Sequence, residues 1–151
     1  MSQRINLSKP NEGVNGMAAV GAWLRTALDP GLLLLVEVRA SQMNGCANCL
    51  HMHAAEALKH DSPKRLLLLD AWHESAMYTP RERAALAWTE SLTRIAETHA
   101  PDEVYEELKR HFSADEIIAL SVAIAMINAW NRLAIGARVE HPADKPLPLA
   151  A

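Results

Sequence analysis

Two cysteines and a histidine, Cys46, Cys49 and His53, follow one another at spacings that suit thiol chemistry. In a helix that begins near Cys46, residues three and four apart lie on one face, so both sulfurs and the imidazole would share it. Cys46 would lie at the helix N-terminus, where free N–H groups and the dipole favour thiolate. His53, one turn after Cys49, can accept a thiol proton, whereas His51 lies off this face. The spacing therefore predicts catalytic residues of a dithiol site that carries its own base.

The same residues allow two other interpretations. Cys-x-x-Cys could be half of a zinc site, with His51, His53 and His60 as further ligands, but a structural zinc needs four ligands and no second paired motif is present. The cysteines could also be inert core residues, because free cysteine is often buried. Adjacent Asn44 and Asn48 argue against a purely apolar pocket. We therefore favour redox chemistry and assign neither a metal nor a cofactor to the site.

Signals for helix starts and stops place this motif in a chain that is helical almost throughout. Ser62-Pro63 reads as an N-cap with a first-turn proline, and Thr79–Glu82 and Ser113–Glu116 read as capping boxes. Asp29-Pro30 and Asn44-Gly45 end helices. Nothing resembles alternating strands. We expect an all-α bundle of about six to seven helices, over residues 14–28, 31–43, 46–60, 63–77, 80–99, 102–111 and 114–137.

Composition limits the class of protein. With 151 residues, half of them apolar, the chain is expected to form one domain, 1–151, with a core at about 14–138. The net charge of −3 comes from interspersed charges, so no basic stripe suggests nucleic acid. Residues 1–15 lack the apolar stretch of a signal peptide, and the apolar run 117–127 is too short to span a bilayer. A cytoplasmic protein without membrane or nucleic-acid partners follows, with residues 1–15 and 141–151 loosely held.

The cysteine motif stands in a longer recognisable context. The segment 37–53, EVRASQMNGCANCLHMH, is accompanied by matching residues at 71–74, 82–86, 89–90, 111–113 and 127–133. Together these residues resemble the alkylhydroperoxidase-D-like, or carboxymuconolactone decarboxylase, family from about residue 14 to 138. The resemblance implies an all-helical, AhpD-like fold that assembles as trimers or hexamers.

The resemblance also implies an activity, the reduction of a small-molecule peroxide by a disulfide-forming dithiol. Carried over, Cys49 attacks the peroxide, Cys46 resolves it, His53 relays the proton and a dithiol reductant resets the pair. Helical geometry alone favours Cys46 as the more acidic thiol, but we follow the position of His53, because a local base can deprotonate Cys49 during attack. The family's decarboxylases lack the cysteine pair, which makes decarboxylation the less expected activity. A redox-sensing or structural protein with oxidisable but non-catalytic cysteines is a further alternative.

One position departs from the family pattern. The proton relay usually includes a Glu twelve residues before the first cysteine, where this chain has Leu34. Glu37 follows three residues later, and Glu82 and Glu90 lie on a later helix that could fold against the site. The sequence leaves all three carboxylates open as partners of the histidine.

A polar cluster interrupts the apolar last helix. Asn128, Asn131 and Arg132 fall at i, i+3 and i+4 spacing and need hydrogen-bond partners if they are buried. They could bond neighbouring helix ends, cross a subunit interface or line the active pocket. A structural role is favoured, since most buried polar side chains simply satisfy backbone or water.

Overall fold

The computed structural model describes residues 2–9 and 11–140, and this part of the chain is built from helices without any strand. The all-α prediction is therefore confirmed, and the expectation about residues 141–151 lies outside the described residues. Along the chain the elements are α1 (Glu12–Ala27), α2 (Pro30–Asn44), α3 (Ala47–Ala57), α4 (Pro63–Leu68), the 3-10 turn η1 (Leu69–Ala71), α5 (Pro80–Thr93), α6 (Ile95–Thr98), α7 (Asp102–Lys109) and α8 (Ala114–Ala137).

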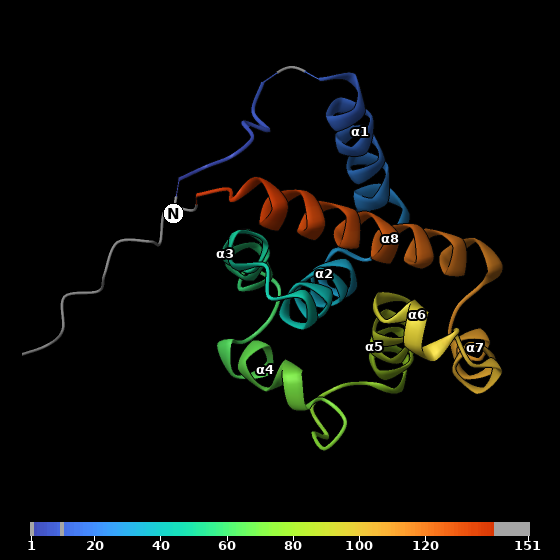
Figure 1. Ribbon diagram of the computed structural model, residues 1–151. Helices are drawn as coiled ribbons and strands as arrows, with labels where there is room; N and C mark the ends of the chain where they lie inside the picture. The colour runs from blue at the N-terminus through green and yellow to red at the C-terminus, as the bar shows by residue number, and fades with distance from the viewer. Residues whose placement is uncertain (1, 10, 141–151) are drawn as a thin grey trace, which may run out of the picture.

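Helix α2 is the central element of the bundle. It packs against α3, α5 and α8, and α8 also packs against α1. In Figure 1, α8, in orange and red, runs across the molecule between α1 and the other helices. From Leu32 to Ser41 every residue of α2 but Glu37 is buried. This all-round burial explains why Leu32 to Val36 form an unbroken apolar run rather than an amphipathic pattern, and the buried polar residues that follow, Arg39 and Ser41, have hydrogen-bond partners.

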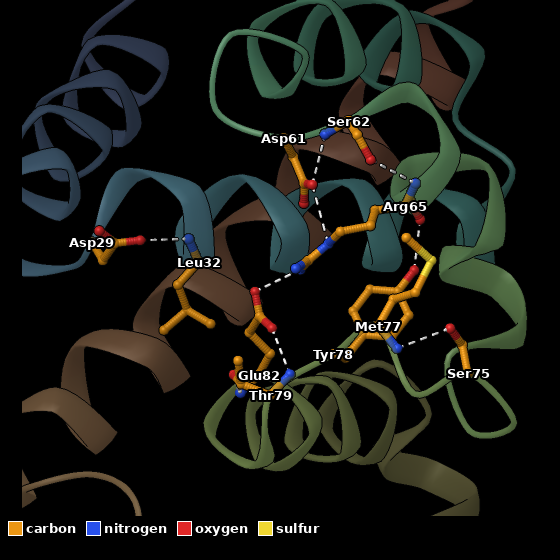
Figure 2. Close-up of polar contacts among 10 residues, drawn as sticks. All are labelled: Asp29, Leu32, Asp61, Ser62, Arg65, Ser75, Met77, Tyr78, Thr79 and Glu82. Carbon is orange, nitrogen blue, oxygen red and sulfur yellow. Dashed lines mark hydrogen bonds and ion pairs between the residues drawn. The ribbon is translucent and has the colours of Figure 1, made fainter.

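The helix starts expected from sequence are present. Ser62 caps α4 by accepting a hydrogen bond from the Arg65 N–H at 3.2 Å. Asp29, expected only to end the preceding helix, also caps α2 by accepting a hydrogen bond from the Leu32 N–H at 2.9 Å. Thr79 at α5 and Ser113 at α8 form complete capping boxes with the glutamates three residues on. The caps of α2, α4 and α5 can be followed in Figure 2. Each cap satisfies helix N–H groups that have no partner within the helix, which is why these local signals are reliable.

One predicted helix is wrong in its second half. The helix expected over 63–77 ends at Leu68, continues only as η1, and gives way to turns before α5. The Arg83 guanidinium donates hydrogen bonds to the carbonyl oxygens of Trp72, His73 and Ser75 at 2.8, 2.9 and 3.0 Å. A distant side chain thus takes the place of helical N–H donors, so the turn satisfies its backbone without being a helix.

A second predicted helix is broken in two. The segment expected as one helix over 80–99 is interrupted at Arg94, with φ −106° and ψ 38°, which separates α5 from α6. The Thr98 hydroxyl donates to the carbonyl of Ser91 at 2.7 Å. This side-chain bond serves a carbonyl near the end of α5 and holds α6 back against it. The break raises the number of α-helices in the described residues to eight.

Helix α8 is long and apolar enough to cross a bilayer when judged by length and composition alone. Half of its most apolar stretch is buried inside the protein. The core helix of a soluble protein meets the same criterion, so this match is weak evidence for a membrane segment.

Candidate active site

The turn between α2 and α3 places Cys46. Gly45 ends α2 in the left-handed region at φ 67°, a conformation that glycine adopts without a steric cost. Cys46 is the N-cap of α3, and its sulfur accepts the N–H of Cys49 at 3.3 Å. The sulfur therefore lies at the positive end of α3, where a thiolate would be stabilised by that N–H and by the dipole.

The two sulfurs are joined. Cys46 and Cys49 form a disulfide across a Cα–Cα separation of 5.3 Å, and the two residues are only 1% and 4% exposed. They pack against side chains of α2 and α8 and of the segment that follows α8, namely Ala40, Ile127, Trp130, Ala134 and Val139. The spacing argument thus correctly places both sulfurs on one side of α3, within reach of each other.

His53 has a carboxylate partner. Its Nδ1 lies 3.0 Å from Oε2 of Glu37, and both side chains are largely buried, at 23% and 19% exposure. Since Nδ1 is engaged by the carboxylate, Nε2 is the nitrogen left to exchange a proton with another group. His53 lies one turn after Cys49 on α3, so the imidazole follows the sulfur along the same helix.

A small cavity of about 170 Å³ adjoins this pair. Its lining includes Glu37 and His53 together with the apolar residues Leu33 and Leu34. Leu34, where the family pattern has a glutamate, therefore lies in the same cavity as Glu37, one helical turn away on α2. The carboxylate thus lies three residues later in the sequence than in the family pattern, and it still contacts His53.

The other two candidate carboxylates are engaged elsewhere. Glu82 closes the capping box of α5 by accepting the Thr79 N–H at 2.7 Å, and it also accepts a bond from Arg65 at 2.6 Å. Figure 2 shows Glu82 between these two partners, with Arg65 also paired to Asp61. Glu82 therefore supports the junction of α4 and α5 and does not reach His53.

Glu90 belongs to a separate ionic cluster. It accepts bonds from Arg39 at 2.8 Å and from the Trp72 indole at 2.7 Å, and it lies 3.3 Å from His73. Burial raises the pKa of the Glu90 carboxyl, but the hydrogen bond from Trp72 and the charge and hydrogen bond of Arg39 outweigh burial and leave that pKa below its ordinary value. Arg39 also pairs with Asp70. These contacts join α2, η1 and α5 beneath the site.

The asparagines of α8 prove to be neighbours of the cysteine turn. Asn44, two residues before Cys46, donates to the side-chain oxygens of Asn128 and Asn131 at 2.9 and 2.8 Å. Sequence spacing identified the α8 residues as polar positions in need of partners, but their partner on the turn lies 84 and 87 residues away in the chain. No local pattern could have revealed it.

The alternative interpretation is a zinc site made by the cysteine pair with His51, His53 and His60 as further ligands. Within residues 2–9 and 11–140, no group of three or more His, Cys, Asp or Glu side chains is gathered in a way that could hold a metal ion. His60 lines the cavity beside His53.

A disulfide at a helix N-terminus, followed one turn later by a carboxylate-bound imidazole, defines the class: an all-helical dithiol protein with an AhpD-like fold. The carboxymuconolactone decarboxylase family model matches residues 11–91, and the chain belongs to this family.

Two curated relatives are uncharacterised. The chain is 40% identical to protein YdfG of Bacillus subtilis over 138 residues, which cover 89% of this chain and 94% of that protein. It is 30% identical to protein YnjA of Escherichia coli over 110 residues, covering 70% of this chain and 60% of that protein.

Solved structures share the fold. A protein of unknown function from Agrobacterium tumefaciens, provisionally assigned to antioxidant defence as AhpD, is 40% identical with a TM-score of 0.90, covering 95% of this chain and all of that one. A peroxidase-related protein from Silicibacter is 23% identical with a TM-score of 0.77, covering 88% of this chain and 72% of that one. At that identity the likeness extends to the fold alone.

Proposed function

We propose that the protein is a thiol-dependent peroxidase that reduces peroxides through a Cys46–Cys49 disulfide cycle. The observation that carries this proposal is the disulfide itself, closed within the first turn of α3. Two cysteines so arranged can alternate between dithiol and disulfide without moving the helices that hold them. The provisional assignment of the Agrobacterium tumefaciens protein to antioxidant defence supports this proposal.

In the proposed cycle, the Cys49 thiolate attacks the distal oxygen of a hydroperoxide, whose O–O bond breaks. Cys49 becomes a sulfenic acid and the peroxide leaves as an alcohol, or as water from hydrogen peroxide. The Cys46 sulfur then attacks the sulfur of the sulfenic acid and forms the disulfide. The hydroxyl group leaves as water, together with the proton of the Cys46 thiol. A dithiol donor reduces the disulfide by exchange and restores both thiols.

The proposed proton relay runs through His53. Its Nε2 takes the thiol proton from Cys49 and passes it to the departing oxygen. Glu37 holds Nδ1 at 3.0 Å and so fixes the tautomer in which Nε2 is the accepting atom. The displaced carboxylate thereby supplies the function that the family assigns to the position of Leu34.

The test is steady-state consumption of tert-butyl hydroperoxide with dithiothreitol as donor, comparing wild type with Cys49→Ser, Cys46→Ser and His53→Gln. Cys49→Ser should lose turnover entirely, because the peroxide-attacking sulfur is gone. Cys46→Ser should still react once, leaving a sulfenic acid that dimedone traps. A Cys49→Ser protein that turns over peroxide overturns the assigned order of the two thiols.

The same assay separates the rival functions. A redox sensor would lose two thiols per chain to peroxide and regain them with dithiothreitol, but so slowly that peroxide consumption in the assay stays at the rate of dithiothreitol alone. A decarboxylase of the family would keep its activity when both cysteines are replaced by serine. Peroxide consumption by the wild-type protein no faster than with dithiothreitol alone rejects the peroxidase.

The partners of the cycle complete the proposal. We propose a small-molecule peroxide as substrate, a cellular dithiol as reductant, a cytoplasmic location and a homo-oligomer, trimer or hexamer. Exposed apolar side chains on α1 and α8, Trp23, Ile118 and Ile135, provide surface that a second copy could cover. Light scattering after size-exclusion chromatography measures the assembly, and a monomer would reject it.

A further inference from the structure

A buried polar cluster lies between α8 and the turn that carries Cys46. Asn131 is fully buried, and Asn128 is 8% exposed. Besides its bond to Asn44, Asn128 donates to the Thr93 hydroxyl at 3.0 Å and to the Ile124 carbonyl at 2.9 Å. Such a cluster costs desolvation energy unless its members are satisfied, and this one is satisfied within the protein.

Asn131 makes two hydrogen bonds to the end of α2, where the turn that carries Cys46 begins. Its side-chain oxygen accepts the bond from Asn44 at 2.8 Å, and its amide nitrogen donates to the Ser41 hydroxyl at 3.1 Å. The backbone carbonyl of Ser41 in turn accepts a hydrogen bond from the backbone N–H of Cys46 at 3.1 Å. One side chain of α8 therefore fixes the last turn of α2 before Gly45 and, through Ser41, the backbone of the resolving cysteine.

The position of Cys46 matters because disulfide closure is an intramolecular reaction. Its equilibrium and rate depend on how often the two sulfurs meet in the right geometry, that is, on their effective concentration. Cys49 is fixed by α3, since it lies within the helix. Cys46 lies just outside it, after the glycine, so its freedom depends on what holds the turn.

Building on the proposed dithiol cycle, we propose that Asn131 is a positioning residue for its resolving step: it holds Cys46 against Cys49 and so sets the thiol–disulfide equilibrium of the pair. The step it assists is attack of the Cys46 sulfur on the Cys49 sulfenic acid, which forms the S–S bond and releases water. Asn44 is the hydrogen-bond partner of Asn131 in this role. Asn131 acts on the reaction through the position of Cys46.

The test measures the disulfide equilibrium directly, apart from turnover. Wild type, Asn131→Ala and Asn44→Ala are equilibrated in dithiothreitol buffers of stated reduced-to-oxidised ratio, and free thiols are counted by alkylation and mass spectrometry. Loss of a positioning hydrogen bond should shift the equilibrium toward the dithiol by about tenfold, which is about 30 mV toward a more positive potential for a two-electron couple. Disulfide closure after one equivalent of tert-butyl hydroperoxide should slow to a similar degree.

Ser121→Ala is the matched control. It lies on the same helix, and its hydroxyl accepts a bond from the indole of Trp88 on α5 at 2.9 Å. Its thermal stability should fall while the equilibrium of Cys46 and Cys49 stays at the wild-type value. If Asn131 contributed to stability alone, Asn131→Ala and Asn44→Ala would behave like Ser121→Ala, with lower thermal stability and an unchanged thiol–disulfide equilibrium.

The outcomes are distinguishable. If folded Asn131→Ala keeps the wild-type equilibrium within twofold, the positioning role is rejected while the peroxidase stands. If Asn131→Ala does not fold, Asn44→Ala decides in its place, because Asn44 is only half-buried at the end of α2. If the wild-type protein forms no reversible disulfide, the proposed function fails and this role fails with it.

Discussion

At the scale of single residues, the site depends on which carboxylate reaches His53. Three glutamates were open from sequence, and each has a distinct task in the folded protein. Glu37 binds the imidazole, Glu82 caps α5 and Glu90 neutralises Arg39. Replacing each glutamate in turn by glutamine therefore distinguishes a role in the proton relay from a role in stability.

Glu37→Gln should lower kcat/KM for tert-butyl hydroperoxide by about tenfold to a hundredfold, because an amide can either accept from or donate to Nδ1 and so no longer fixes the tautomer as the acceptor-only carboxylate does. Glu82→Gln and Glu90→Gln serve as matched controls that remove one carboxylate each. They should keep the wild-type kcat/KM and lose stability toward urea instead. Equal loss of activity in all three variants would contradict the assignment of Glu37.

At the scale of elements, the caps set where helices begin and long-range side chains set where some of them end. The clearest case is the stretch after η1, which leaves the helix because Arg83 binds the carbonyls of Trp72, His73 and Ser75. Arg83 lies on α5, so the end of one element is decided by the start of another.

Arg83→Lys should destabilise the protein by about 2 kcal/mol, because an ammonium group cannot reproduce the fork of donors that holds the turn. Arg110→Lys is the control, since Arg110 is exposed and bonds only Glu107 on its own helix turn. Its stability should stay within about 0.5 kcal/mol of wild type. Urea unfolding followed by circular dichroism measures both, and equal stabilities would contradict the role of Arg83.

At the scale of the whole molecule, the Arg39–Glu90 pair ties α2 to α5, and the bond of Arg39 to Asp70 adds η1. The Arg39 side chain is only 9% exposed and that of Glu90 is 24% exposed, so the pair is poorly screened by solvent. Its loss leaves a buried guanidinium with Asp70 as its remaining carboxylate, which is 80% exposed. The pair is therefore expected to make the stability of the fold sensitive to acid.

The pKa of Glu90 is lower in the folded protein than its ordinary value. The unfolded chain therefore binds a proton more readily, and the stability from this carboxylate is present above the ordinary pKa of about 4.3 and is lost as pH falls through the folded pKa. At pH 7 Glu90→Gln should be less stable than wild type by about 2 kcal/mol. The difference should shrink below pH 4 in urea titrations, and a constant difference across pH would contradict this linkage.

The sequence by itself determined what depends on neighbours in the chain. Caps at Ser62, Thr79 and Ser113 are bonds across three residues, and the spacing of Cys46 and Cys49 brings the two sulfurs within reach of each other. These features were predicted because a short segment contains both partners of each bond.

Tertiary structure decided what depends on residues far apart in sequence. The breaks at Leu68 and Arg94 lie in segments whose local propensity is helical, yet their carbonyls are served by Arg83 and by Thr98. The choice of Glu37 over two other glutamates, and the contact of Asn131 with the cysteine turn 87 residues earlier, follow from the packing of α3 and α8 on α2. Periodicity defines the face that a side chain occupies, but only the fold brings a second element to that face.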